Sequence, residues 1–511
     1  MVRDAELLVS SLPATRFRQQ GIDSGAARSL RSFWPEWCAL ALYAALVACA
    51  IPYHEPWADE AQTWQLAHSL PLLSLFKTYI RYEVSPGLWP LLLWILIRLH
   101  ITYAGLHWIC GLIAAAGAAL LLFKSPFPRW LKLPLPFTCF LLFQYAVVAR
   151  NYVLAPPLMF LAAILWKKSP LRLALVLGLL ANVALHTTMI ASVLVLIYLI
   201  EQVRSAGVKT LLGQCKFVGA VAVFLAFLAF ALYTAWPPHD LAFAPDRSLP
   251  TFLPRFLTAL FWPVCYPQLL SLSFWVVIAV LFYARRNLLF LFPILLYALF
   301  CGVVYLVWWH AGLIAVLLIG MLWITWPPAA QPIQSGERYG RIAFAVMIAF
   351  QIGWSGYALY YDHYFAFAPD PATAAYLRPF VNEGAPIAVT YLKDYRAGSS
   401  QAFLSVGPEP FFDHNIYANT PYPFWWWSKK DRSDADFNAL LPTHPRFVLV
   451  VSIKPGTIAQ PDLDHPIYRT LANQGYQYRN TFCGSQPMGP QLGLTVCHVI
   501  YEYPIRPGAF K

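Results

Sequence analysis

The chain has 511 residues, of which 59% are hydrophobic and only 12% are charged. Soluble globular proteins carry about 25% charged residues, so the composition excludes that class and indicates a polytopic membrane protein. The net charge of +12 does not indicate a nucleic-acid partner, because Lys and Arg lie in short loops between apolar runs, where positive charge marks the cytoplasmic side.

Residues 1–33 are polar and mixed in charge, and we expect them to form a cytoplasmic leader. They lack the short apolar core and the small-residue cleavage site of a signal peptide. The apolar segment at residues 33–52 is therefore expected to stay in the protein as an anchor that enters the membrane from the cytoplasm. Residues 53–86 then form a first outer loop.

Further apolar segments of spanning or near-spanning length follow at residues 87–101, 103–123, 133–148, 152–166, 171–185, 189–200, 211–236, 269–284, 288–307, 311–326 and 342–361. Several are shorter than the roughly 20 residues of a straight span, so tilted or broken helices are expected. Basic loops alternate with loops poor in Lys and Arg from Lys124 onward, which leaves the C-terminal region outside. We expect about eleven to thirteen transmembrane helices in all.

The stretch from residue 87 to residue 123 conflicts with this alternation. Its hydropathy suggests two segments, but an odd number of crossings is needed to connect the outer loop to the basic loop at Lys124. Either one segment is re-entrant or interfacial, or the positive-inside rule fails locally.

The composition changes after Tyr361 to regular charge, many Pro and Gly residues and short β-type runs at residues 386–391 and 446–452. The expected fold is thus an α-helical polytopic membrane protein with a C-terminal soluble α/β periplasmic domain. Its expected parts are the leader 1–33, a catalytic membrane domain 34–361 and the periplasmic domain 362–511. Cys483 and Cys497 flank a Gly/Pro-rich stretch, and the sequence leaves open whether they form a disulfide.

Asp59 and Glu60 lie just after the first apolar segment, in a chain where charge is scarce. A carboxylate pair beside the hydrocarbon boundary costs free energy unless function or a partner retains it, so we expect the catalytic centre here. We expect residues 59–76 to form one helix on the membrane surface, with Trp64 and Leu66 facing lipid. A plain interfacial helix with acids at its N-terminus is the alternative.

The first outer loop carries a family resemblance. Trp57-Ala-Asp59-Glu60-Ala-Gln62-Thr-Trp64, followed by Tyr82-Glu83-Val-Ser-Pro86-Gly-Leu-Trp89, resembles the start of bacterial GT-C glycosyltransferases, relatives of the protein O-mannosyltransferases and the lipid A aminoarabinose transferase. The resemblance covers residues 34 to 326. Related sequences often carry a His before the loop Pro, where this chain has Ser85.

The resemblance implies an inverting transfer of a sugar from a polyprenyl-phosphate carrier to an acceptor on the outer face, with Asp59 activating the acceptor hydroxyl. Glu60 would be a second polar or metal contact. Some members of the superfamily use a divalent cation such as Mg²⁺ or Mn²⁺ and others do not, so the cofactor is open, with Asp59 and Glu60 the ligands if a metal binds. The implied partners are the lipid-linked sugar, membrane lipid and an unidentified glycan, lipid or protein acceptor.

The remaining candidate substrate-binding residues are polar or aromatic side chains of the outer loop and of later outer boundaries. They are His54, Gln62, Trp64, Arg81, Glu83, Arg150, Asn151, Tyr152, His186 and His310. Arg150 is the first candidate for the carrier phosphate because Arg offers a bidentate fork, and Arg81 is its competitor. Snorkelling explains a boundary Arg equally well, while His186 and His310 have structural alternatives as a helix-end residue and a member of the aromatic belt.

A polytopic lipid or glycan flippase without transferase activity is the alternative function. It would be equally apolar and basic, yet it should carry ionisable groups near mid-span and often shows internal pseudo-symmetry. Charges near mid-span are scarce here, and the two halves do not resemble each other. The sequence therefore favours the enzyme.

Overall fold

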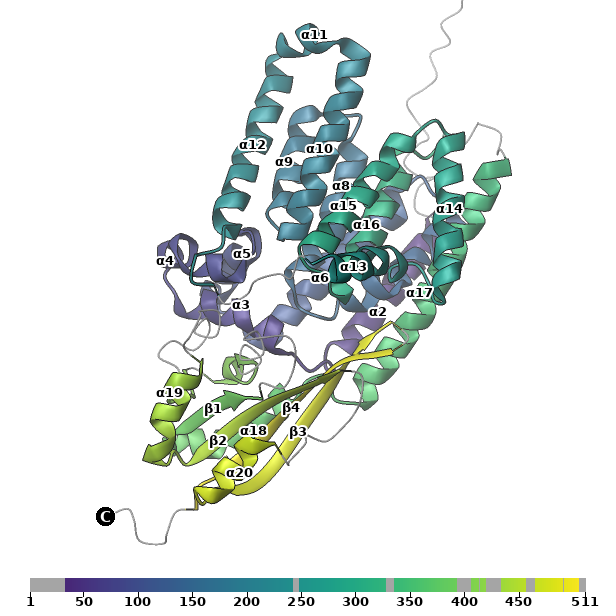
Figure 1. The fold of residues 1–511 in the computed structure, drawn as a ribbon. Helices are drawn as coiled ribbons and strands as arrows, with labels where there is room; N and C mark the ends of the chain where they lie inside the picture. The colour runs from purple at the N-terminus through teal and green to yellow at the C-terminus, as the bar shows by residue number, and fades with distance from the viewer. Residues whose placement is uncertain are drawn as a thin grey trace, which may run out of the picture.

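A computed structural model describes residues 33–241, 248–327, 335–392, 406–412, 414–419, 433–455, 465–489 and 491–504. A large helical part narrows at one end onto a small sheet domain (Figure 1). The expected combination of a helical, membrane-type part and a C-terminal α/β domain is confirmed. Of the expected leader, residues 1–32 lie outside the described residues.

The helical part is built from apolar helices of unequal length. They are α2 (Trp34–Ala50), α6 (Tyr103–Lys124), α8 (Ala155–Leu165), α9 (Pro170–Ala181), α10 (Leu185–Ala206), α12 (Cys215–Ala235), α13 (Leu249–Phe261), α14 (Gln268–Ala284), α15 (Phe292–Val303), α16 (Trp308–Ile324) and α17 (Ser335–Tyr364). Four helices among the described residues, α6, α10, α12 and α17, are long and apolar enough to cross a membrane, and eight shorter apolar helices accompany them. Helix α13 was not expected from the sequence.

The segment at residues 133–148 does not form a membrane-length helix. It folds into the short helices η2 (Leu135–Phe137) and η3 (Phe140–Gln144), the latter with π geometry. Leu141, Phe143 and Tyr145 are buried among the surrounding helices. Its apolar character therefore reflects burial inside the protein rather than contact with lipid, and hydropathy alone does not separate these two environments.

The first outer loop is also divided differently from the expectation. Helix α3 (Ala58–Ser69) ends before Pro71, which lacks the N–H needed to continue it, and α4 (Leu72–Lys77) and the 3₁₀ helix η1 (Tyr79–Glu83) follow. The expected single surface helix over residues 59–76 is therefore wrong. Trp64 and Leu66 are 4% and 0% exposed, so they pack inside the protein rather than face lipid.

Helix α5 (Leu88–Arg98) bears on the conflict between residues 87 and 123. Its 11 residues extend about 16 Å, roughly half the hydrocarbon thickness. The Arg98 guanidinium at its C-terminal end donates to the Ala67 carbonyl oxygen of α3 at 2.7 Å. Because α5 packs along α3 and is shorter than a straight span, it fits the re-entrant or interfacial alternative, whereas α6 is long and apolar enough to cross a membrane.

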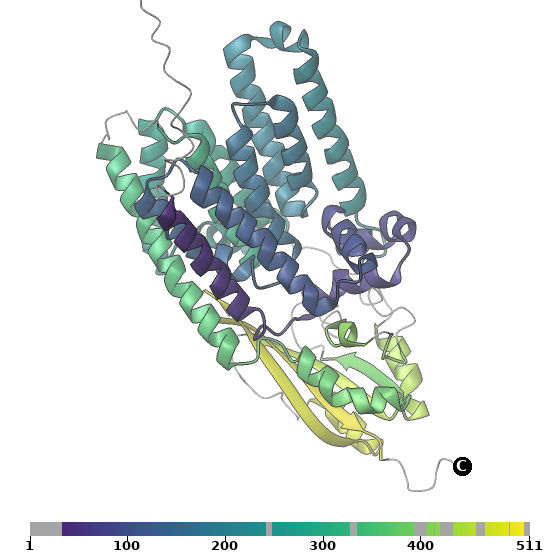
Figure 2. The ribbon, with the colours of Figure 1, turned by 180° about the vertical axis from the view of Figure 1, so that it is seen from behind.

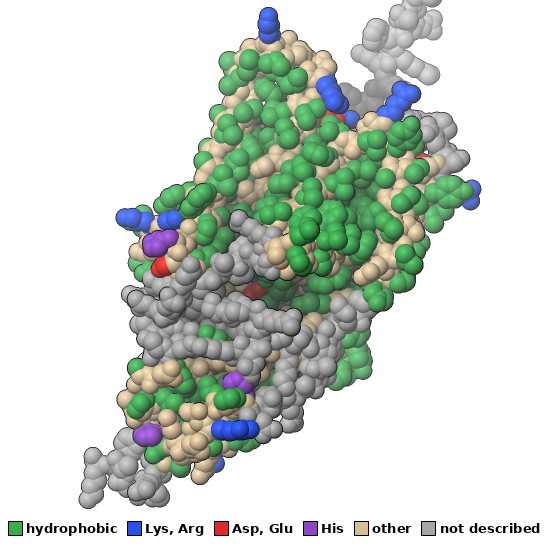
Figure 3. Space-filling view, in the orientation of Figure 1, with side chains coloured by type: hydrophobic (Ala, Val, Ile, Leu, Met, Phe, Trp, Pro, Cys, Tyr) green, Lys and Arg blue, Asp and Glu red, His purple; other side chains and the backbone are tan. Residues whose placement is uncertain are grey.

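Lys and Arg gather at the end of the helical part that lies farthest from the sheet domain (Figure 3). Two buried carboxylates hold basic groups there: Glu36 at the start of α2 pairs with Arg129 and Lys132, each at 2.9 Å. Glu337 pairs with Arg285 and Arg341 at 3.2 and 2.5 Å. Several of the basic loops identified in the sequence therefore meet acidic partners from other segments.

The C-terminal domain is a four-stranded sheet with three helices. Its elements are α18 (Asp370–Asn382), β1 (Ile387–Tyr391), α19 (Ser433–Leu440), β2 (Phe447–Pro455), α20 (Pro466–Asn473), β3 (Gln477–Met488) and β4 (Gln491–Glu502). The strand order is β1-β2-β4-β3, with β1 and β2 parallel and the other pairs antiparallel. Both β-type runs identified in the sequence lie in neighbouring strands, β1 and β2.

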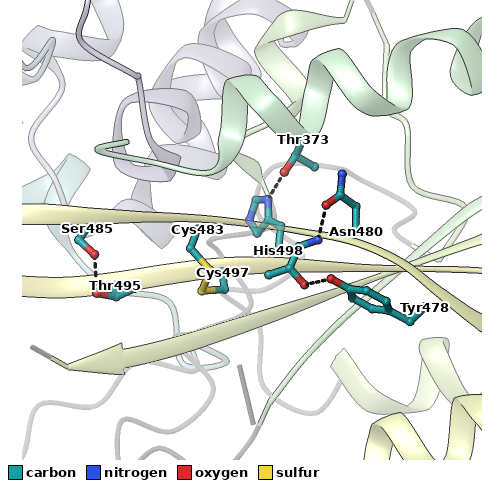
Figure 4. Close-up of a disulfide and its surroundings, with 9 residues drawn as sticks. Thr373, Tyr478, Asn480, Cys483, Ser485, Thr495, Cys497 and His498 are labelled. Carbon is teal, nitrogen blue, oxygen red and sulfur yellow. Dashed lines mark hydrogen bonds between the residues drawn. A yellow bond between two sulfur atoms is a disulfide. The ribbon is translucent and has the colours of Figure 1, made fainter. Parts of the chain in front are cut away.

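Cys483 and Cys497 form a disulfide between β3 and β4, which settles a pairing that the sequence left open. Figure 4 shows this bond and two nearby hydrogen bonds. Ser485 and Thr495 link β3 to β4 at 2.6 Å, and Thr373 of α18 bonds to His498 of β4 at 3.0 Å. The seven other cysteines are free thiols.

Helix α17 runs the length of the helical part and leads directly into the sheet domain (Figures 1 and 2). Helix α2 lies beside it and ends at the same level, so the first outer loop meets the C-terminal domain. The Glu55 carboxylate accepts the Ala368 N–H at 3.3 Å, and the ring of Tyr103 contacts Phe411. The first outer loop and the C-terminal domain therefore lie at the same end of the molecule.

Candidate functional site

Asp59 and Arg150 form an ion pair at the junction between the apolar helices and the first outer loop. Asp59 lies in the first turn of α3, and Arg150 precedes the 3₁₀ helix η4 (Asn151–Leu154), which leads into α8. Their side chains are 12% and 20% exposed, so the pair is shielded yet reachable. Burial raises the pKa of the Asp59 carboxyl, and the positive charge of Arg150 opposes that rise.

A second carboxyl group, Glu83, lies close to this pair. The Gln62 amide and the Thr63 hydroxyl both donate to its carboxylate. Burial and the nearby negative charge of Asp59 raise the pKa of Glu83 to about 7. Two carboxyl groups with different environments thus lie near each other, an arrangement that separates their proton affinities.

Aromatic rings and two histidines enclose the other side of Arg150. Its guanidinium lies 5.0 Å from the ring centroid of Trp309 and 5.5 Å from that of Tyr152. The Tyr152 hydroxyl is 2.8 Å from His310 Nε2, and the His310 ring stacks on His186 at 3.6 Å. Residues from α3, η4, α10 and α16 therefore converge on one site, which we call the Asp59–Arg150 site.

One nitrogen in this site has no hydrogen-bond partner among the described residues. His310 is 4% exposed, and its Nδ1 atom is buried without a partner, whereas Nε2 meets Tyr152. A buried polar atom left unpaired costs free energy and is commonly satisfied by a ligand or water. A ligand or an ordered water at this atom would complete the hydrogen bonds of His310.

Several predicted site residues do not join this group. Arg81, the competing candidate for the carrier phosphate, donates to the Trp236 carbonyl oxygen at 2.9 Å. Asn151 is buried and donates to the Val183 carbonyl oxygen at 2.8 Å. Trp64 is buried against the ring of Tyr103, on the other side of α3. These three side chains have structural partners.

Glu60 and His54 also lie apart from Asp59, in a second buried cluster. Glu60 Oε1 is 3.2 Å from His54 Nε2 and accepts the Trp57 N–H at 3.1 Å. His54 Nδ1 is 3.0 Å from Asp362. Burial lowers the pKa of His54, but the carboxylates of Asp362 and Glu60 raise it, to about 10 overall. Burial raises the pKa of Glu60, and His54 and His107 more than reverse that rise.

Two members of this cluster, His107 and Asp362, were not among the residues expected from the sequence. His107 is an ionisable residue inside the apolar helix α6, a signal that would have marked it as a candidate. Asp362 is the first acid after the last apolar segment, just as Asp59 follows the first one closely. No local pattern indicates that residues 54 and 362 meet, because 308 positions separate them.

A glycosyltransferase of known structure is similar to this chain, whereas no protein-family model and no curated protein matches it. The similar structure is the arabinofuranosyltransferase AftD from Mycobacteria, determined by single-particle cryo-electron microscopy. The match has 15% sequence identity and a TM-score of 0.38, and it covers 92% of this chain. The present chain spans 40% of the length of that structure.

Proposed function

We propose that this chain is an integral-membrane glycosyltransferase that moves a sugar from a polyprenyl-phosphate-linked donor to an acceptor at the periplasmic face of the bacterial inner membrane. The observation that carries the proposal is the Asp59–Arg150 site. It combines a partly shielded carboxylate, a guanidinium and an unpaired His310 nitrogen at the boundary between apolar helices and an outer loop. A lipid-linked donor presents its phosphate and sugar at that depth.

The chemistry is a single displacement. Asp59 accepts the proton of the acceptor hydroxyl while the hydroxyl oxygen bonds to the anomeric carbon. The bond from that carbon to the carrier phosphate breaks on the opposite face, so the configuration inverts and polyprenyl phosphate leaves. Burial makes the Asp59 carboxylate a stronger base than a solvated one, and Arg150 is positioned to pair with the phosphate charge.

The distribution of charge favours this function over a flippase. Helices α8, α15 and α16 contain no Asp, Glu, Lys or Arg, and α12 contains only Lys216, near its start. A flippase would be expected to place ionisable groups along its transport path. Here the ion pair and its partners gather at one boundary, as a reaction at the membrane surface requires.

Release of the carrier tests the proposed function even while the sugar is unidentified. The purified full-length protein is incubated with a panel of synthetic polyprenyl-phosphate-linked sugars, and free polyprenyl phosphate is measured by mass spectrometry. We expect release with at least one donor, increased by an acceptor extract of the cell envelope. Movement of intact donor across liposomes without any release would instead establish a flippase.

The periplasmic placement is part of the same proposal. It is supported by the far-end position of the basic loops and by the Cys483–Cys497 disulfide, since disulfides persist in oxidising compartments. Alkaline phosphatase fused after Tyr361 is expected to be active, and a fusion in the loop of Lys167 and Lys168 inactive, because this reporter needs the periplasm. The reverse pattern would put Asp59 in the cytoplasm and contradict the mechanism.

A further inference from the structure

A compact group of metal-ligand side chains lies beside the Asp59–Arg150 site, around Glu60 of α3. It consists of His54, Glu60 and His107, whose ligand atoms all lie within 4.8 Å of one another. His54 Nε2 is 3.2 Å from Glu60 Oε1, and His107 Nε2 is 3.1 Å from Glu60 Oε2. The three side chains are between 0% and 4% exposed.

The outer hydrogen bonds of both imidazoles orient their Nε2 atoms toward the centre of this group. His54 Nδ1 lies 3.0 Å from the Asp362 carboxylate, and His107 Nδ1 lies 3.3 Å from the Tyr103 carbonyl oxygen. Both of these oxygens accept hydrogen bonds, so each Nδ1 carries the proton. With Nδ1 as the donor on each ring, the two Nε2 atoms face the oxygens of Glu60, where either a ring proton or a metal ion can lie.

The same pattern surrounds histidines that bind metals. A metal-bound histidine donates its second ring N–H to a carboxylate or a backbone carbonyl, which fixes the tautomer and the ring orientation. His54 and His107 have one partner of each kind. We propose that His54, Glu60 and His107 bind a divalent transition-metal ion of the zinc class.

The ligand set and its spacing select the kind of metal. Two imidazole nitrogens and one carboxylate form a common ligand set for Zn²⁺, whereas Mg²⁺ and Ca²⁺ prefer oxygen ligands alone. Ligands about 2.0–2.1 Å from a tetrahedral ion lie roughly 3.3 Å from one another. Each imidazole lies 3.1–3.2 Å from one oxygen of Glu60, and the three ligand atoms lie within 4.8 Å of one another, so a small inward movement of the side chains would complete the coordination of a zinc-class ion.

A cavity of about 710 Å³ adjoins the group and is lined by both histidines and by Asp362. It lies between the first outer loop, α6, the end of α17 and the C-terminal domain. Water from this cavity is the natural source of the fourth ligand of a tetrahedral ion. The protein would supply three ligands and leave one coordination position to solvent.

The position of Glu60 gives the ion a role in organising the neighbouring site. Glu60 also accepts the N–H groups of Trp57 and Ala149, at 3.1 and 2.6 Å. Because Glu60 follows Asp59 and Ala149 precedes Arg150, the ion would fix the backbone on both sides of that pair. Through Asp362 it would also attach the end of α17. The metal site itself does not depend on the proposed transferase activity.

Metal content tests this inference directly. The full-length protein is purified through a tag that binds no metal, from cells grown with added zinc, and its metals are measured by inductively coupled plasma mass spectrometry. We expect about one zinc ion per chain, falling at least roughly tenfold in His107→Gln and in His54→Gln. His363→Gln is the matched control, because His363 lines the same cavity but is not a ligand, and it should keep its zinc.

A spectroscopic measurement on the wild-type protein covers the case in which a variant fails to fold. Replacing zinc with Co²⁺ should give the intense visible absorption of a tetrahedral or five-coordinate site, and circular dichroism reports whether each variant is folded. Wild-type protein without bound transition metal and without a Co²⁺ spectrum would show that protons bridge these side chains instead. Folded variants that keep a full complement of zinc would also overturn the inference.

Discussion

Replacing Asp59 with Asn is expected to lower the rate of sugar transfer by about 10²–10⁴, the typical contribution of a general base. The amide keeps the shape of the carboxyl group but cannot accept the proton of the acceptor hydroxyl. The variant should remain folded, because Asp59 is partly exposed and the amide oxygen can still accept a hydrogen bond from Arg150. The measurement is the rate of polyprenyl phosphate release by purified protein at saturating donor.

Asp240→Asn provides a matched control for this substitution. Asp240 accepts the Tyr82 hydroxyl at 2.9 Å, close to the first outer loop but outside the Asp59–Arg150 site. It should change the rate less than about fivefold, since a partly exposed hydrogen bond contributes only about 1 kcal/mol. Near wild-type turnover by Asp59→Asn would show that another group is the base.

Replacing Arg150 with Ala is expected to weaken binding of the donor lipid by roughly 30-fold or more. This corresponds to at least about 2 kcal/mol, the lower bound for removing one partner of a desolvated charge pair. The carrier phosphate must lie at interface depth, because its chain stays in lipid. Arg150 should also affect the pH profile: without its charge the pKa of Asp59 rises further, so the pH below which activity is lost moves upward.

Two further variants test how Arg150 contributes to binding of the donor lipid. Arg150→Lys should recover only part of the affinity, because a point charge replaces a planar fork. Arg81→Ala should bind the donor like the wild type, because Arg81 is engaged by the Trp236 carbonyl oxygen. A lipid titration in which Arg81→Ala loses binding and Arg150→Ala does not would move the phosphate site into the first outer loop.

The sequence predicted the features that depend on residues close together in the chain, namely the helices, the domain boundary and several boundary residues. Hydropathy located most of the apolar helices, and the change in composition after Tyr361 located a C-terminal domain that begins with α18 at Asp370. The sidedness argument also selected Arg150, His186 and His310 as boundary residues, and the structure brings Arg150 and His310 together around Tyr152. Each selection used only the residue type and its distance from an apolar segment.

The remaining features depend on packing between distant segments. Residues 133–148 are apolar because other helices surround them, and hydropathy gives the same signal for lipid. Asp59 and Glu60 were treated as one centre, yet successive helical residues point about 100° apart, so one faces Arg150 and the other faces two histidines. Two partners of Glu60, His107 on α6 and the N–H group of Ala149, come from distant segments, and no local spacing indicates these contacts.

The short helix α5 also bears on how the protein fits its membrane. Together with α3 and α4, it lies at the end of the helical part nearest the sheet domain, so in a membrane these helices would widen the protein on that side. A body that is wider in one leaflet has a wedge shape, and the lipids around it must compensate through their own packing and curvature. Lipid packing around this wider end would act on the segment that carries Asp59, so we expect the proposed activity to vary with the lipid composition chosen for reconstitution.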